Sequence, residues 1–211
     1  MLREETVQPA TLELLKKIVL LPELNQFRLV GGTALSLQFG HRKSIDLDFF
    51  TDQPFDKEIL VETLENNFGK IATTNERTKS IYQCIIRGVK VYFVSVRDPF
   101  LYPVQLIDNI PFADVKDLIA LKLNAIKGRG VKKDFWGIAK LLHFYSFDSL
   151  FQFYHDRYKY DDTFAVIRSV IYFTDAEDDA DPEDLDGMTW SDVKETITRG
   201  FDDYYKKRIK N

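Results

Sequence analysis

One short block constrains the fold of this chain more than any other part of its sequence. Residues 30–50 read VGGTALSLQFGHRKSIDLDFF, which is a Gly-Gly pair, an apolar run and then two aspartates one residue apart. Side chains alternate between the two faces of a β-strand, so we expect Asp46 and Asp48 on one face and Leu47 on the other. Two carboxylates that converge from one strand supply half of a site for a divalent metal ion.

The Gly31-Gly32 pair follows an apolar run at residues 27–30, a pattern that predicts a buried strand ending in a turn. Glycine allows the backbone to approach a neighbour closely. A glycine turn that leads into a helix also exposes backbone N–H groups at the positive end of the helix dipole. Phosphate is the ligand that such a turn favours.

Each of these features also has an ordinary structural interpretation. A Gly-Gly pair is most often only a turn, and charged residues in a strand often protect a solvated sheet edge. The combination is more specific, because Ile45, Leu47 and Phe49 place the aspartates in an apolar strand. Carboxylates in apolar surroundings require a cation or hydrogen-bond donors, which favours a metal or phosphate site.

The motifs GGTAL, HR-S and DLDFF in this block resemble the nucleotidyltransferase superfamily of the polymerase-β type, and specifically the AbiEii/AbiGii-like toxin family of abortive-infection systems. The resemblance implies that Asp46 and Asp48 bind Mg²⁺ and, through it, a nucleoside triphosphate (NTP). It also implies nucleotide contacts from the glycine turn and from the segment before the acids: Gly31, Gly32, Thr33, Arg42 and Ser44. His41 lies in the same segment, where a single histidine packs or caps about as often as it acts.

A second informative block lies at residues 114–142, DVKDLIALKLNAIKGRGVKKDFWGIAKLL. Lys122 follows an apolar helical stripe, and the pattern alone favours a lysine that extends to water. The family has a lysine, an arginine and a Lys-Asp pair in such helices, and Lys122, Arg129, Lys133 and Asp134 match them. The resemblance therefore implies that Lys122 and Lys133 neutralise nucleotide charge, and that Asp134 either orients a basic side chain or assists the metal ion.

Hydrophobic periodicity predicts a mixed α/β half followed by a helical half. Helices are expected at residues 11–21, 33–39 and 56–67, and strands at 27–30, 45–50, 70–75, 80–87 and 90–96, with a hairpin connection at 87–90. From residue 113 the pattern is helical almost to the end, and the last amphipathic helix packs Trp190. We therefore expect an α+β fold: a nucleotidyltransferase-like domain with a small mixed sheet flanked by helices at residues 1–112, and a C-terminal helical bundle at 113–211.

Composition fits a compact enzyme without a membrane span. The chain has 211 residues, and no apolar run approaches the ~20 residues that cross a bilayer. The N-terminus lacks the pattern of a secretory signal. The single cysteine, Cys84, cannot form an internal disulfide and is expected in the core. These features suit a cytoplasmic protein.

Charge is unevenly distributed along the chain. Residues 174–187 contain eight acids and no base, namely Asp175, Glu177, Asp178, Asp179, Asp181, Glu183, Asp184 and Asp186. The whole chain has 33 acidic and 29 basic residues, so the remainder is mildly basic, which is compatible with a nucleotide or RNA partner. The acidic segment lacks the spacing of an EF-hand, and a solvated linker is the favoured interpretation.

Two positions depart from the family pattern. Enzymes of this superfamily use a third carboxylate on a neighbouring strand, and Tyr92 stands at the matching position of the run Val89-Lys90-Val91-Tyr92. Gly137 stands where relatives tend to have another aspartate. Since the third acid commonly binds the catalytic ion or accepts the proton of the attacking hydroxyl, either Asp98 or Asp134 replaces it or catalysis is impaired.

Three functional hypotheses follow for this chain. The first is an Mg²⁺-dependent nucleotidyltransferase toxin that transfers a nucleotidyl group from an NTP to a hydroxyl of tRNA, another RNA or a protein, with a cognate antitoxin as the implied partner. The second is a catalytically impaired nucleotide-binding or toxin–antitoxin interaction protein. The third is a structural protein with an inherited fold.

Overall fold

Seven strands form one mixed sheet in the computed structural model, which describes residues 1–75 and 78–209. The strands are β1 (Arg28–Val30), β2 (Leu47–Thr51), β3 (Ala72–Asn75), β4 (Ile81–Ile86), β5 (Val89–Ser95), β6 (Gln105–Ile107) and β7 (Ile110–Phe112). Their order across the sheet is β3-β4-β5-β2-β1-β7-β6. The pairs β2–β5 and β1–β7 are parallel, and the other neighbouring pairs are antiparallel.

The chain divides into two compact units. Unit 1 comprises Met1–Gln38 and Ser44–Asp114 and contains the whole sheet, whereas unit 2 comprises Phe39–Lys43 and Val115–Asn211. The short segment Phe39–Lys43, which carries His41 and Arg42, thus belongs with unit 2 although both of its flanks belong to unit 1. The expected domain boundary between residues 112 and 113 stays a prediction.

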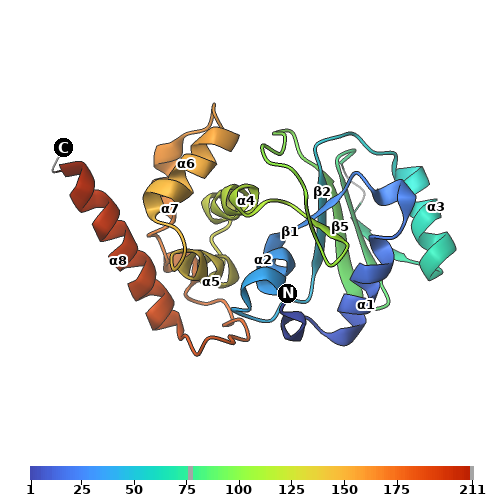
Figure 1. Cartoon of the computed structure of the whole chain (residues 1–211), viewed down its shortest axis with the longest axis horizontal. Coiled ribbons are helices and arrows are strands. Elements are labelled where there is room, and N and C mark those ends of the chain that lie inside the picture. The colour runs from blue at the N-terminus through green and yellow to red at the C-terminus, as the bar shows by residue number, and fades with distance from the viewer. Residues whose placement is uncertain (76–77, 210–211) are drawn as a thin grey trace. The chain divides into compact units, whose positions relative to one another are not determined.

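Three α-helices accompany the sheet in the described part of unit 1: α1 (Pro9–Ile18), α2 (Gly31–Phe39) and α3 (Lys57–Phe68). Figure 1 shows α2 on one face of the sheet and α1 and α3 on the other. The start of α3 follows from its sequence, because the Asp56 side chain accepts hydrogen bonds from the backbone N–H groups of Glu58 and Ile59 at 2.8 and 3.3 Å. A carboxylate there satisfies donors that the helix itself leaves unpaired.

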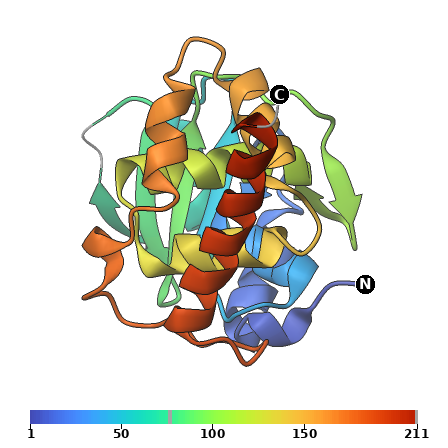
Figure 2. The same cartoon turned by 90° about the vertical axis from the view of Figure 1, so that its left-hand side faces the viewer.

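The longer secondary-structure elements in the described part of unit 2 are all helices. Its helices are α4 (Val115–Gly128), α5 (Lys132–Leu141), α6 (Phe147–Arg157), α7 (Thr163–Ser169) and α8 (Trp190–Ile209). The 20-residue α8 packs on α5 and α6, and Figure 2 shows it running across the front of these helices. Three short 3-10 helices, Glu4–Thr6, Pro22–Leu24 and Thr174–Ala176, complete the described chain.

The core of unit 1 orients strand β2. Leu47, Phe49 and Thr51 are buried, whereas the two residues between them are only partly buried. The Phe49 ring stacks on Phe93 of β5 with centroids 5.4 Å apart. Burial of one face of β2 therefore turns Asp48 to the opposite face of the sheet, as the alternation of the sequence predicts.

The β4–β5 hairpin confirms its predicted position. Arg87 and Gly88 have φ angles of 51° and 83°, the left-handed conformation that a two-residue type I′ turn requires. Ile86 consequently pairs with Val89, and Gln83 with Tyr92. Cys84 is buried in the same strand, and burial raises the pKa of its thiol to about 12, which agrees with the predicted core position.

The α+β fold with a mixed sheet and a helical C-terminal half is confirmed. Two details were wrong: β2 begins at Leu47, so Asp46 precedes the strand, and Ile45 is 62% exposed. Strands β6 and β7 were not predicted, because each has only three residues and prolines interrupt the stretch that carries them. None of the described helices is both long enough and apolar enough to cross a membrane.

Candidate functional site

Asp48 lies in a row of residues that crosses four strands. It pairs with Val30 of β1 and, in the parallel register, with Tyr92 of β5. Tyr92 in turn pairs with Gln83 of β4, whose side-chain Nε2 donates a hydrogen bond to the Tyr92 hydroxyl at 3.1 Å. Residues in register on adjacent strands direct their side chains to the same face, so Tyr92 stands directly beside Asp48.

The glycine turn and the acidic strand meet at Gly31. This residue begins α2 with a φ of +72°, a conformation that favours glycine. A Cβ atom at Gly31 would lie only 2.0 Å from Asp48 Oδ2. The Asp48 carboxylate therefore rests against the backbone at the start of α2, where the first N–H groups have no partner within the helix. Two features that the sequence analysis linked are in contact.

Hydroxyl groups connect the start of α2 to the segment before β2. The Thr33 side chain is buried, and its Oγ1 lies 2.9 Å from Ser44 Oγ and donates a hydrogen bond to the Asp46 carbonyl. The predicted nucleotide contacts Thr33 and Ser44 thus engage each other here. The Thr33 hydroxyl therefore fixes the backbone of Asp46 close to the first turn of α2.

The donor set of unit 1 fits magnesium. Mg²⁺ in nucleotide enzymes is bound by one or two carboxylates together with substrate phosphates and water, so Asp46 and Asp48 suffice as protein ligands. The Asp48 carboxylate occupies the space that a side chain at position 31 would fill, so glycine is what allows this predicted ligand to lie beside the helix N-terminus. Within the described residues no cluster of three or more His, Cys, Asp or Glu side chains forms a site made by protein ligands alone.

Lys122 and Asp134 form a buried ion pair in unit 2. Lys122 Nζ lies 2.9 Å from Asp134 Oδ1, and the two side chains are 6% and 1% exposed. Arg129 Nε donates to the other carboxylate oxygen at 3.0 Å. Lys122 therefore does not extend to water, and the helix break at Gly128-Arg129-Gly130 brings its basic residue back to α5. Of the two implied roles of Asp134, this arrangement favours the orientation of basic side chains.

The charges of this pair depend on one another. Burial lowers the pKa of Lys122, and the Asp134 carboxylate opposes that effect. Burial by itself raises the pKa of Asp134, but Lys122 and Arg129 outweigh it and hold that pKa below its ordinary value. Asp134 is therefore ionised at neutral pH. Loss of Asp134 would leave the buried Lys122 without this counter-charge, which is costly in a low-dielectric interior, whereas loss of Lys122 would leave Asp134 with Arg129.

His41 is a buried neutral imidazole within the same unit. It is 2% exposed, and neither ring nitrogen has a hydrogen-bond partner among the residues that the structure describes. Burial, together with the positive charges of Arg42, Lys122 and Lys140, lowers the pKa of His41 from 6.5 to about 2. His41 therefore marks a part of unit 2 that is rich in positive charge.

The acidic segment at residues 174–187 is not a solvated linker, contrary to the sequence-based expectation. Five of its carboxylates accept from groups of α5, α8 and the segment before α8. The contacts are Glu177 with Trp190 Nε1 and Lys194, Asp179 with Lys132 N, Asp181 with Lys132 Nζ, Asp184 with Trp136 Nε1 and Met188 N, and Asp186 with Lys140. The prediction failed because most of these partners lie on α5, more than forty residues away in the sequence.

The remaining predicted residues have separate surroundings. Lys133 is exposed at the second position of α5, and Gly137 is buried one turn after Asp134 on the same helix. Asp98 follows β5 in a loop. Trp190 is 9% exposed and stacks on Trp136 with centroids 5.7 Å apart, which confirms its predicted packing role.

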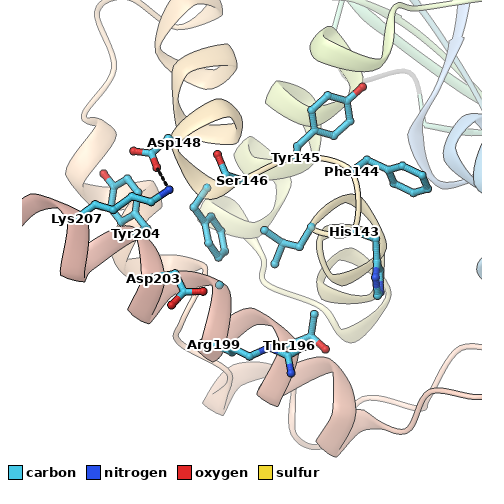
Figure 3. A pocket seen from close by; sticks show the side chains of 13 residues that line it. His143, Phe144, Tyr145, Ser146, Asp148, Thr196, Arg199, Asp203, Tyr204 and Lys207 are labelled. Atoms are coloured by element: carbon cyan, nitrogen blue, oxygen red, sulfur yellow. Dashed lines mark ion pairs between the residues drawn. The ribbon is translucent and has the colours of Figure 1, made fainter.

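A pocket of about 420 Å³ in unit 2 contains none of the predicted site residues. In Figure 3, His143, Phe144 and Tyr145 come from the turn after α5, and Arg199 and Asp203 come from α8. At one end Asp148 is neutralised by Lys207 and Arg208 at 3.7 and 2.6 Å. The pocket is therefore distinct from the glycine turn and acidic strand of unit 1.

Sequence reasoning missed two residues that adjoin the predicted positions. Gln83 holds the Tyr92 hydroxyl, and the signal for it was present, since counting back from the Arg87-Gly88 turn pairs position 83 with position 92. Asp184 was grouped with the acidic segment, and nothing local in the sequence distinguishes it from its acidic neighbours.

Comparisons with known proteins agree on the fold. The family described as "Nucleotidyl transferase AbiEii toxin, Type IV TA system" matches residues 13–207. A protein of Aquifex aeolicus (aq_aa25), described as uncharacterized, is 31% identical over 204 residues, which is 91% of this chain and 94% of that protein.

Two solved structures are similar in fold at low sequence identity. A putative nucleotidyltransferase from H. pylori has a TM-score of 0.59 and 20% identity, covering 96% of this chain and 98% of that one. MenT4, a nucleotidyltransferase toxin from Mycobacterium tuberculosis, has a TM-score of 0.57 and 16% identity, covering 94% and 84% of the two chains. The nucleotidyltransferase-type fold therefore extends over nearly the whole chain.

The close approach of Gly31 to Asp48 predicts the effect of a single methyl group. Gly31→Ala places a Cβ against Asp48 Oδ2 in a left-handed conformation that costs about 1–2 kcal/mol for other residues. We expect it to lower the free energy of unfolding, measured in urea, by more than Gly88→Ala does. Gly88 has a similar φ of +83° and open space around it. Equal losses in the two variants would show that Asp48 does not press on Gly31.

The buried imidazole predicts a pH dependence of stability. Unfolding returns the pKa of His41 to about 6.5, so the unfolded chain binds a proton below pH 6.5 that the folded chain does not bind until about pH 2. Stability should fall by about 1.4 kcal/mol from this group between pH 7.5 and 5.5. In His41→Gln that part of the loss should disappear in urea unfolding, whereas the same substitution at exposed His155 is the control. An unchanged pH dependence in His41→Gln would contradict a buried neutral imidazole.

Proposed function

The chain belongs to the AbiEii family of nucleotidyl transferase toxins, and we propose that it transfers a nucleotidyl group from an NTP to a hydroxyl group of RNA or protein. The observation that carries the proposal is the contact between Gly31 and the Asp48 carboxylate. It joins a glycine turn at a helix N-terminus, which favours phosphate, to a carboxylate pair that suits a divalent cation.

Asp46 and Asp48 are the proposed ligands of Mg²⁺. When bound, the ion would neutralise phosphate charge and make the attacking hydroxyl more acidic. The protein supplies the position of the carboxylates: the core face of β2 fixes Asp48, and Thr33 fixes the backbone of Asp46. Nucleotidyl transfer depends mainly on such positioning and on charge neutralisation.

The phosphates are proposed to lie at the start of α2, against the backbone of Gly31, Gly32 and Thr33. Arg42, which is buried and whose Nη1 donates to the Lys43 carbonyl at 2.7 Å, is proposed to supply positive charge for the phosphates. Ser44 acts through the Thr33 hydroxyl at 2.9 Å, so its proposed role is to support the turn.

In unit 2, Lys122 is the proposed neutralising charge for the nucleotide, with Asp134 as the group that orients it. The 2.9 Å ion pair and the second contact to Arg129 support this division of roles. Lys133, exposed at the start of α5, is proposed to contact nucleotide or acceptor phosphates. Substitutions of these unit 2 residues can test each role separately from the roles of the unit 1 residues.

The proposed reaction is a single displacement at phosphorus. The oxygen of the acceptor hydroxyl forms a bond to the α-phosphorus of the NTP, and the bond between that phosphorus and the bridging oxygen breaks. Pyrophosphate leaves with the electron pair, and the hydroxyl proton passes to solvent. We propose an RNA such as tRNA as the acceptor, a cytoplasmic location that supplies NTPs, and a cognate antitoxin that controls the activity.

Binding of NTPs tests the proposed metal ligands. Titration calorimetry with each of the four NTPs should show Mg²⁺-dependent binding to the wild type, because Asp46 and Asp48 would hold the ion and the ion would neutralise phosphate charge. Asp46→Asn and Asp48→Asn, which keep the side-chain shape and remove the charge, should weaken binding at least tenfold.

A third acid near the same strand provides the control. Asp52 follows β2 directly and accepts a hydrogen bond from Phe100 N at 3.1 Å, so Asp52→Asn should leave NTP affinity within about twofold. Transfer of radiolabelled NTP to total RNA should depend on Asp46 and Asp48 in the same way. Full transfer activity in the Asp46→Asn/Asp48→Asn double variant would contradict the proposal.

A second candidate function is nucleotide binding with little or no turnover. The register that pairs Tyr92 with Asp48 favours it, since the residue beside the catalytic carboxylate is a phenol and not an acid. A phenol hydrogen-bonded to Gln83 is a weaker metal ligand and a weaker proton acceptor than a carboxylate at neutral pH.

Restoring the acid distinguishes the two functions. Tyr92→Asp should raise the rate of nucleotidyl transfer at least tenfold, because a third carboxylate then stands beside Asp48, while NTP affinity changes little. Single-turnover transfer and calorimetry measure the two quantities. Tyr92→Phe is the matched control, since it removes the hydroxyl without adding an acid. A loss of transfer in both variants would instead show that the Tyr92 hydroxyl takes part in the reaction.

A further inference from the structure

The acidic segment forms a short backbone bridge with the segment that carries Arg42. Lys43 N donates to the Glu183 carbonyl at 2.8 Å, and Leu185 N donates to the His41 carbonyl at 3.0 Å. Arg42 and Asp184 are the paired residues of this isolated antiparallel bridge. The bridge lies outside the sheet and joins two parts of unit 2 that are more than a hundred residues apart in the sequence.

Asp184 attaches this bridge to helix α5. Its Oδ1 accepts from the indole Nε1 of Trp136 at 2.9 Å, and its Oδ2 accepts from Met188 N at 2.7 Å. Both carboxylate oxygens are thus used while the Asp184 backbone pairs with Arg42. Two residues later, Asp186 binds Lys140 of the same helix at 2.8 Å. Residues 183–186 therefore connect residues 41–43 to α5 through two side chains.

The helix that receives these contacts is rigidly packed. Trp136 is 2% exposed and stacks on Trp190 at an interplanar angle of 12°. One half-turn before Trp136, Asp134 holds Lys122 and Arg129. A rigid support of this kind transmits a fixed position to whatever is attached to it, and through Asp184 that is the Arg42 segment.

We propose that Asp184 is a positioning residue for Arg42, fixing the backbone of residues 41–43 so that the Arg42 guanidinium is held for a phosphate group of the NTP. The inference rests on the proposed function, in which Arg42 contributes charge to nucleotide binding. It assigns to the acidic segment a role in preorganising the site, since a cation whose backbone is held loses less conformational freedom when it binds.

The same segment supplies a matched control. Glu177 accepts from the indole Nε1 of Trp190 at 2.9 Å and pairs with Lys194 at 2.8 Å, which repeats the carboxylate-to-indole contact of Asp184. Glu177 lies outside the bridge to residues 41–43. Glu177→Ala therefore removes an equivalent contact from the acidic segment and leaves the bridge in place.

Amide hydrogen exchange of the full chain, resolved to single residues, tests the bridge directly. In Asp184→Ala the amides of Lys43 and Leu185 should exchange at least tenfold faster than in the wild type, because their carbonyl partners are no longer held. In Glu177→Ala their exchange should stay within about twofold. Unchanged amide exchange in Asp184→Ala would overturn the inference, whether or not the chain binds NTP.

Calorimetry with the four NTPs and Mg²⁺ tests the consequence for Arg42. Asp184→Ala should raise the Kd at least fivefold, and Arg42→Ala at least as much. The double variant should bind no more weakly than Arg42→Ala, because residues that act through one another are not additive. If the losses of NTP affinity in Asp184→Ala and Arg42→Ala were additive in the double variant, the assignment would be overturned. It would also be overturned if Asp184→Ala showed fast amide exchange but an unchanged Kd.

A second variant separates positioning from stability. Asp184→Ala leaves the buried Trp136 N–H without its acceptor, which itself costs stability. Adding Trp136→Phe removes that donor and should recover part of the melting temperature, but the Kd for NTP should stay raised. Recovery of the Kd together with the melting temperature would show a merely structural role. If the wild type and Arg42→Ala bound NTP with equal Kd, the proposed nucleotide role of Arg42 would be refuted. Hydrogen exchange would still report separately whether Asp184 holds the bridge.

Discussion

The close approach of the Asp48 carboxylate to the backbone of Gly31 is the constraint on which the rest of unit 1 depends. A side chain at position 31 would occupy the place of Asp48 Oδ2, so only glycine lets the strand that carries the acid lie beside the start of α2. The φ of +72° at Gly31 then turns the chain directly from β1 into the helix. One residue thereby sets both the helix N-terminus and the position of the carboxylate beside it.

Unit 2 is organised by buried and partly buried charges rather than by an apolar core alone. Asp134 satisfies two cations at once, and Arg157 is paired with Asp117 at 2.7 Å where both side chains are almost fully buried. Such pairs are weak sources of net stability, but each leaves a costly charge behind if one partner is lost. They therefore specify one arrangement of α4, α5 and α6.

Much of the architecture could be predicted from local patterns, and the failures have physical causes. The alternation in β2, the Arg87-Gly88 hairpin and the helical stripes of α4 and α8 depend on residues close in sequence, so periodicity and turn chemistry identify them. The family resemblance anticipated the toxin nucleotidyltransferase family. The solvated linker was wrong because most partners of the acidic segment lie on α5, far away in the sequence. Strands β6 and β7 were missed because they are short and because prolines interrupt their stretch, although the two strands pair with each other. The position of the Lys122 side chain could not be predicted, because its partner Asp134 lies twelve residues away on another helix.

The sequence by itself determined an α+β fold, because glycines, alternating acids and helical periods act over a few neighbouring residues. Its resemblance to a known family, and not these local patterns, added the nucleotidyltransferase type and the candidate ligands. Tertiary structure alone decided that Asp48 rests on Gly31, that Tyr92 stands beside Asp48, and that Asp184 joins residues 41–43 to α5. These relations depend on strand register and on contacts between distant segments. The free energy of burying a polar group depends on its partner, and here the partner lies too far along the chain for local sequence to reveal it.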